Sequence, residues 1–283
     1  ALKLKKLAND ICAVVGGRHI HAITPQVGGF SHIPSEAELL KTKKMLLDTW
    51  PDFEATVELF KTLEVPELDR ETELVSLKSD EEYALYDGKI YSSVGGYTEV
   101  EQYKNQVHEY CVPYSASKQA YGNQDSYLCG ALARVHNNYD QLTPRAKQVM
   151  SDLGLTLPCT NTFHNNTAQI VECVHCFDDA VATIDTLLER GLEPGWPEVK
   201  VRAGRGAASV EAPRGILFHE YEFDREGRIV KANCIIPTGQ NLANIENDMR
   251  AYVPTVMDKP EDEIRLGCEM LVRAYDPCIS CAT

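Results

Sequence analysis

The fold class is decided by the stretch TAQIVECVHCFDDAVATIDTLLER, residues 167–190. Asn165 or Asn166 can cap its start, and Gly191 and Pro194 mark its end. Its apolar side chains recur at steps of four and three residues, which is the period of one helix face: Ile170, Val174, Phe177, Val181, Ile184 and Leu188. The stretch therefore predicts a long helix that packs against neighbouring helices.

N-terminal to this helix, the sequence predicts two further helical segments. Residues 1–15 carry apolar side chains at helical spacing and are followed by Gly16-Gly17, a helix-ending pair. Residues 35–64 also show a helical pattern, with an interruption expected near Trp50-Pro51. Short strands are expected around residues 85–91, within a largely irregular segment.

C-terminal to the helix, the sequence predicts a β-hairpin and one more helix. Gly215–Phe223 and Ile229–Ile236 are strand-like and are joined by a short polar turn. A last helix begins at Pro260 and must stop before Pro277. The predicted fold class is mostly α with a small β component (α+β), a helical bundle core with a β-hairpin that carries Arg214.

The overall charge excludes several classes of partner. The 283 residues include 28 Lys and Arg against 42 Asp and Glu, a net charge of −14. Nucleic acid and anionic membrane surfaces both require a basic patch, and no such patch is present. No apolar run approaches the roughly 18–20 residues of a membrane span. No signal peptide opens the chain, so its ten cysteines favour free thiols or metal ligands in a reducing, cytoplasmic compartment.

Two CxxC pairs are present, and they are not equivalent. Cys173 and Cys176 lie within the strongest helix beside its apolar stripe, which favours packing as small hydrophobic side chains. Cys278 and Cys281 follow a helix-ending proline, where two thiolates can reach one soft metal. All four together would also fit a zinc or iron–sulfur site.

A second candidate constellation lies at the start of the hairpin. Arg214 is a permanent cation between a proline and a glycine in the segment Glu211–Gly215. Such an arginine is suited either to positioned donation to a polar ligand or to an ion pair at a strand end, and this stretch alone leaves both open. Thr238 follows the second strand and could offer a hydroxyl to the group that Arg214 faces.

Four motifs, in this order, resemble those of nickel–iron hydrogenase large subunits: Gly16–His21 with Gly28-Gly29, Glu211–His219, Pro237-Thr238, and Arg273–Thr283. Their order and spacing agree over nearly the whole chain. The segment Asn241–Met249 resembles the soluble, cytoplasmic, bidirectional branch. Enzymes of that branch couple dihydrogen to nicotinamide, deazaflavin or heterodisulfide-linked electron carriers.

The resemblance implies an enzyme, an oxidoreductase for the reversible heterolytic cleavage of dihydrogen at a nickel–iron centre whose iron carries carbon monoxide and cyanide. Cys278 matches a terminal nickel ligand, and Cys281 matches the ligand that bridges nickel and iron. Arg214 matches the arginine over the open metal position, and Asp276 matches a carboxylate beside it. The Cys278 thiolate is the implied proton acceptor, with Arg214 as a competing candidate.

Three further positions follow from the same resemblance. Pro213 and Thr238 match residues that line the diatomic ligands of the iron. The main-chain carbonyl of Cys234 matches the position that ligates a magnesium or iron ion near the C-terminus.

The N-terminal CxxC of the family is absent from the sequence. Residues 1–283 are therefore expected to form, as a single unit, the C-terminal part of a large subunit. The expected partners are a chain that supplies the missing CxxC, an iron–sulfur small subunit, plus further electron-transfer subunits. Two alternatives stay open: a metal-free, non-catalytic fragment of the same fold, and a zinc or iron–sulfur protein that uses Cys173, Cys176, Cys278 and Cys281.

Overall fold

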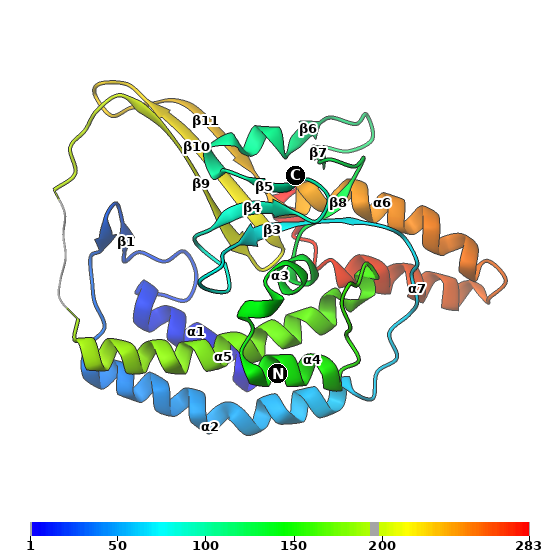
Figure 1. Ribbon diagram of the computed structural model, residues 1–283, viewed down its shortest axis with the longest axis horizontal. Helices are drawn as coiled ribbons and strands as arrows, with labels where there is room; N and C mark the ends of the chain where they lie inside the picture. Colours follow the sequence, from blue (N-terminus) through cyan, green and yellow to red (C-terminus); the bar gives the residue numbers. More distant parts are fainter. Residues whose placement is uncertain (1, 193–197, 283) are drawn as a thin grey trace. The chain divides into compact units, whose positions relative to one another are not determined.

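The computed structural model describes residues 2–192 and 198–282 (Figure 1), so that Pro194 and Thr283 lie outside it. The described residues divide into two compact units. The helical unit runs from the N-terminus to Leu63 and from Cys173 to Val201. The mixed unit runs from Glu64 to Glu172 and from Arg202 to the C-terminus. That both act as one part of a large subunit stays a prediction.

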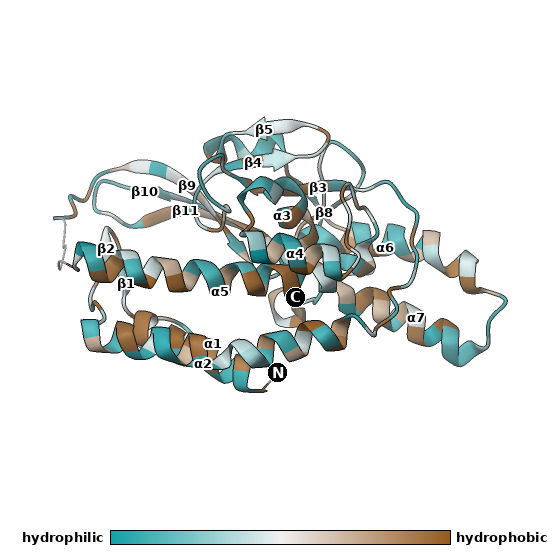
Figure 2. Ribbon diagram, turned by 60° about the horizontal axis from the view of Figure 1, so that its bottom comes forward, coloured by the Kyte–Doolittle hydropathy of each residue, from teal (hydrophilic) through white to brown (hydrophobic). Residues whose placement is uncertain are grey.

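The helical unit is built from α1 (Leu2–Gly16), α2 (Glu36–Phe60) and most of α5 (Asn165–Arg190). Figure 2 shows hydrophobic residues interspersed with hydrophilic ones along α2 and α5. The hydrophobic residues of α1, α2 and α5 form one apolar core between the three helices. Its buried members are Leu7, Leu39, Leu46, Phe177 and Ile184. The predicted stripe of α5 therefore packs as expected. A short hairpin, β1 (Pro25–Gln26) and β2 (Gly29–Phe30), follows α1.

The predicted interruption of α2 near Trp50-Pro51 was wrong. The helix continues through Pro51 as a single element. A proline inside a helix removes one main-chain hydrogen bond. The rings of Trp50 and Phe53 pack on Phe177 at centroid distances of 5.0 and 5.3 Å, and this burial offsets the loss. Ser35 begins the helix with a capping box to Glu38.

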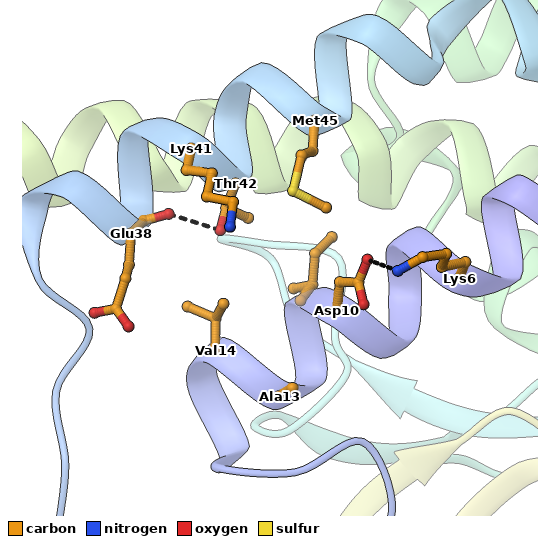
Figure 3. Close-up of a pocket in the computed structure, with 9 residues that line it drawn as sticks. Lys6, Asp10, Ala13, Val14, Glu38, Lys41, Thr42 and Met45 are labelled. Atoms are coloured by element: carbon orange, nitrogen blue, oxygen red, sulfur yellow. Dashed lines mark hydrogen bonds and ion pairs between the residues drawn. The ribbon is translucent and has the colours of Figure 1, made fainter.

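Helices α1 and α2 border a cavity of about 500 Å³ (Figure 3). Val14, Ala13 and Met45 lie toward it, whereas Lys6 is paired with Asp10 at 2.7 Å on its rim. None of the residues predicted for the metal site lines this cavity.

The mixed unit contains several small sheets. Of the short strands expected around residues 85–91, one forms there, at residues 89–92. Its partner lies earlier, at residues 73–78, so the expected position of the first strand was wrong. One sheet has the order β5-β4-β3-β8, and β6 pairs with β7. The bounds are β3 (Glu73–Lys78), β4 (Lys89–Ser92), β5 (Gly96–Thr98), β6 (His108–Tyr110), β7 (Gln119–Tyr121) and β8 (Tyr127–Leu128).

Short helices connect these strands to the rest of the unit. Leu132 on α3 is completely buried, and it is flanked by buried alanines. The bounds are η1 (Val100–Asn105), α3 (Ala131–Asn137), η2 (Tyr139–Gln141), α4 (Pro144–Asp152) and η3 (Thr162–His164).

The predicted hairpin is confirmed as β10 (Gly215–Phe223) and β11 (Ile229–Ile235), and a further strand, β9 (Gly204–Ala212), pairs with its other edge. The order is β11-β10-β9, and all pairs are antiparallel. Ala212 pairs with Gly215, so the turn between β9 and β10 consists of Pro213 and Arg214. Arg214 therefore lies at the tip of a tight turn rather than at the free end of a hairpin.

Two long helices complete the mixed unit: α6 (Pro237–Val256) and α7 (Glu261–Ala274). Pro260 caps α7 instead of starting it, one residue from the expected boundary. The buried face of α6 is unusually polar, since Gln240 and Asn244 are fully buried. The fold class is the predicted one, mostly helical with small sheets. None of the described helices is both long and apolar enough to cross a membrane.

Candidate metal site

The C-terminal turn begins where α7 ends. After Ala274 and Tyr275 the chain reaches Asp276, whose φ of 48° lies in the left-handed region. Aspartate tolerates this conformation better than most residues do. The reversal of direction allows Pro277 to leave the helix, and the segment then closes in a short 3₁₀ turn, η4 (Ile279–Cys281).

This turn places the two C-terminal cysteines side by side. The sulfurs of Cys278 and Cys281 are 2.7 Å apart, and the main-chain N–H of Cys281 donates to the oxygen of Cys278 at 3.2 Å. The hydrogen bond with Cys281, followed by that with Ser280, lowers the pKa of Cys278 to about 7, and the charge of Arg214 contributes in the same direction. The same sulfur contact raises the pKa of Cys281. One proton therefore leaves the pair near neutral pH, while the second is held more tightly.

Arg214 reaches the C-terminal turn from the β9–β10 turn. Its Nε donates to the main-chain oxygen of Asp276 at 2.5 Å, and its Nη2 lies 3.4 Å from the carboxylate oxygen Oδ2 of the same residue. The Arg214 side chain remains 33% exposed, and its contacts with Asp276 use Nε and Nη2, which form one edge of the guanidinium. Arginine suits this task because its donors are fixed in a plane.

Thr238 joins the group from the first turn of α6. Its side chain is buried, and its hydroxyl accepts a hydrogen bond from the main-chain N–H of Cys278 at 3.2 Å. The structure thus brings Arg214, Asp276, Thr238 and the two cysteines together from three separate segments. Pro213 is part of the same turn as Arg214, and its ring is exposed.

Sequence reasoning missed the buried groups behind the Arg214 turn. Gly215 has a φ of +134°, and a Cβ added there would lie 2.5 Å from the sulfur of Cys129. Burial raises the pKa of the Cys129 thiol, so it stays protonated beside the main-chain oxygen of Arg214. Asn241 on α6 and Arg134 on α3 also bond to this turn. Of these three side chains, only Asn241 lies within a motif recognised in the sequence. No sequence pattern pointed to Cys129 or Arg134.

A polar network anchors the end of α7 next to the cysteines. The hydroxyl of Tyr275 donates to the buried carboxylate of Asp248 at 2.5 Å and accepts from Asn244 at 2.8 Å. Burial raises the pKa of Tyr275 well above its ordinary value, so its hydroxyl remains a donor. Asn165 donates to the oxygen of Ala274 at 2.7 Å. These bonds fix the residues directly before Asp276.

Cys234 lies on β11, in register with His219 on β10. Its sulfur is 3.4 Å from Nδ1 of His219 and 3.9 Å from the hydroxyl of Tyr221. These contacts place the Cys234 side chain on one face of the three-stranded sheet. The role expected for its main-chain carbonyl stays a prediction.

The expectation that Cys173 and Cys176 pack in the core was wrong, because both side chains are exposed on α5. Each precedes a buried residue of the stripe, Val174 or Phe177, and a shift of one residue turns a side chain by about 100° around a helix. Across residues 2–192 and 198–282, no group of three or more His, Cys, Asp and Glu side chains is arranged to hold a metal ion.

Comparison with known proteins identifies the relatives of this chain. Residues 55–283 match the profile of the family described as nickel-dependent hydrogenase. The alpha subunit of sulfhydrogenase 1 from Pyrococcus furiosus is 34% identical over 289 aligned residues, which cover 100% of this chain and 66% of that protein. One subunit of the F420-non-reducing hydrogenase from Methanothermobacter thermautotrophicus is 29% identical, with 100% and 64% covered. The chain thus spans just under two thirds of the length of these relatives.

The fold also matches a solved structure. The crystal structure of an NAD+-reducing [NiFe]-hydrogenase in the H2-reduced state superposes with a TM-score of 0.83 at 24% sequence identity. The superposition covers 99% of this chain and 67% of that one. At this level of identity the likeness establishes a shared fold.

Proposed function

Because the chain belongs to the nickel-dependent hydrogenase family, we propose that it carries the C-terminal half of a nickel–iron site and takes part in the reversible heterolytic cleavage of dihydrogen. The observation that supports this function is the convergence of Arg214 and Asp276 on the Cys278–Cys281 turn. The four positions come from two distant motifs, and each has the chemical character that the reaction requires.

The donor set fits a soft transition metal. Cys278 and Cys281 lie on one turn with adjacent sulfurs, and the low pKa of Cys278 supplies a thiolate at neutral pH. Two thiolates do not complete a coordination shell, so the other ligands come from outside this set. When bound, the nickel–iron pair supplies Lewis acidity that polarises dihydrogen, with carbon monoxide and cyanide on the iron.

The residues of this chain have separate tasks in that reaction. The Sγ of Cys278 accepts the proton; Arg214, the competing candidate, would first have to lose its own proton. The fixed cation of Arg214 stabilises negative charge at the open side of the site, and Asp276 holds its guanidinium through a main-chain and a carboxylate oxygen. Thr238 holds the main chain at Cys278, and with Pro213 it would line the diatomic ligands.

The partners follow from the same proposal. The two relatives are each named as one subunit of a larger hydrogenase, which is consistent with a multi-subunit enzyme. An iron–sulfur small subunit, further electron-transfer subunits and a source of the second CxxC pair would complete the assembly in the cytoplasm. A magnesium or iron ion at the Cys234 carbonyl belongs to the same proposal.

Isotope exchange between deuterium gas and water protons tests this function without an electron acceptor. The protein purified with its native partners should catalyse the exchange, and Cys278→Ser should abolish it. Cys268→Ser is the matched control, because Cys268 is half-buried on α7 and should leave exchange unchanged. Exchange that survives Cys278→Ser, or none in the wild type with metal bound, would contradict the proposal.

A further inference from the structure

The side chain of Arg134 is only 3% exposed, and all five of its N–H donors form hydrogen bonds within the protein. Nε and Nη2 donate to the two carboxylate oxygens of Glu172 at 2.6 and 2.7 Å. Nη1 donates to Oε2 of Glu211 at 3.0 Å. Glu172 in turn accepts from the hydroxyl of Tyr83 at 2.7 Å. The charge of Arg134 is therefore fully compensated within the mixed unit.

The two remaining donors bind main chain rather than side chains. Nη1 donates to the oxygen of Ala212 at 2.8 Å, and Nη2 donates to the oxygen of Pro213 at 3.1 Å. The next main-chain oxygen, that of Arg214, accepts from Nδ2 of Asn241 at 3.3 Å. Three consecutive carbonyls at the turn are thus held by two buried side chains, one from α3 and one from α6.

A buried ion pair is a costly way to stabilise a fold, since both charges lose their hydration. Its distinctive gain here is geometric, because a planar guanidinium can bind a carboxylate and two carbonyls in fixed directions. Arg134 binds the carbonyls of Ala212 and Pro213, the two residues immediately before Arg214. The Arg214 side chain in turn points to Asp276.

We propose that Arg134 is a positioning residue for Arg214: by holding the carbonyls of Ala212 and Pro213, it fixes the direction in which the Arg214 guanidinium leaves the turn. The benefit to turnover rests on the proposed function, whereas the positioning itself does not. Lysine cannot replace Arg134, because its three donors radiate from one atom and cannot span Glu172 and both carbonyls.

The test compares Arg134→Lys with Glu172→Gln in the protein purified with its native partners. Both substitutions weaken the same buried pair, but Glu172→Gln leaves the bonds from Arg134 to the two carbonyls in place. Arg214 is monitored by its rate of modification with phenylglyoxal, read by peptide mass spectrometry. Arg265 serves as the internal reference, because its side chain is 66% exposed and lies on α7.

In Arg134→Lys, modification of Arg214 should rise several-fold relative to Arg265, and turnover should fall about 10- to 100-fold, as expected for a displacement near 1 Å. In Glu172→Gln the modification rate of Arg214 and the turnover should both stay near wild type, even though the melting temperature falls. Unchanged modification of Arg214 in folded Arg134→Lys would overturn the proposal, and so would equal effects of the two substitutions.

If Arg134→Lys is not recovered as folded protein, Arg134→Gln combined with Glu172→Gln replaces the ion pair by a neutral pair that is too short to reach the carbonyls. Fast modification of Arg214 in this double variant supports the proposal, and wild-type modification overturns it. Phenylglyoxal reports on Arg214 without metal or turnover. A wild-type protein that binds no nickel would therefore contradict the proposed function and leave the positioning result standing.

Discussion

Arg214 Nε donates to the main-chain oxygen of Asp276 at 2.5 Å, across 62 residues of sequence. This bond joins the β9–β10 turn to the C-terminal turn that carries both cysteines. Because it uses one edge of the guanidinium, the other edge remains available to the site. The relationship explains why an arginine and an aspartate from separate motifs act as one group, and it leads to several predictions.

Arg214→Lys should lower hydrogen-dependent turnover by roughly 100-fold or more, because one ammonium cannot hold Asp276 and face the site at once. Stability should change by less than about 1 kcal/mol, since the ion pair is partly exposed. Dye reduction under hydrogen and thermal melts measure the two effects. Arg265→Lys on the exposed face of α7 is the control. Turnover equal to wild type would show that the guanidinium geometry is not required.

Thr238→Val should loosen the C-terminal turn, because the N–H of Cys278 loses its acceptor. The loss is on the order of 1 kcal/mol. Hydrogen exchange of the peptide that contains Cys278 should accelerate, with little change in the strands. Thr238→Ser keeps the hydroxyl and should exchange like wild type. If valine and serine variants exchange alike, the hydroxyl does not hold the turn.

Gly215→Ala should destabilise the protein by about 2–4 kcal/mol, combining strain at positive φ with overpacking. The added Cβ would meet the sulfur and the main chain of Cys129. Gly206→Ala on β9 is the matched control, because a Cβ there meets nothing within 4 Å. Chemical denaturation of both variants makes the comparison. Equal stabilities would contradict the close approach of the two segments.

Glu211 gives a pH-dependent prediction. Burial raises the pKa of its carboxyl to about 7, although Arg134 opposes the shift. The native state then binds more protons than the unfolded state between about pH 4.5 and 7, so the stabilising contribution is complete below that window and is lost as pH rises through it. The slope is at most about 1.4 kcal/mol per pH unit.

Glu211→Gln removes this titration. The unfolding free energy of the wild type should therefore fall relative to the variant as pH rises from 5 to 8, measured by urea denaturation at each pH. A difference between the two proteins that stays constant over this range would show that Glu211 does not titrate there.

The sequence predicted the helices whose apolar residues recur regularly, such as α5 with its stripe from Val174 to Ile184. It did not reveal α6, whose buried side chains include Gln240, Asn241 and Asn244. Hydropathy cannot detect such a face, because these amides are buried only through hydrogen bonds to distant partners. Strand β9 was missed for a related reason, since Gly204–Ala212 lacks the apolar alternation of a strand.

The candidate site, like the fold, could be predicted from the sequence only in part. Cys278, Cys281 and Arg214 carry chemistry that is recognisable in the sequence, and motif resemblance linked them. The bond from Arg214 to Asp276 and the support from Arg134 depend on how α3, β10 and α7 pack, which no local pattern specifies. The exposure of Cys173 and Cys176 was misjudged because their neighbours, one residue away, form the buried face of α5.

The most direct test of the central claim is the nickel, iron and zinc content of the protein purified with its native partners. We predict nickel and iron in near-equal amounts, after subtraction of cluster iron. Both should be lost in Cys278→Ser/Cys281→Ser and retained in Cys173→Ser/Cys176→Ser. Zinc or cluster iron that is lost with either pair would instead indicate a four-cysteine site. The absence of nickel from the wild type, with its partners bound, would contradict the account and leave a non-catalytic member of the fold.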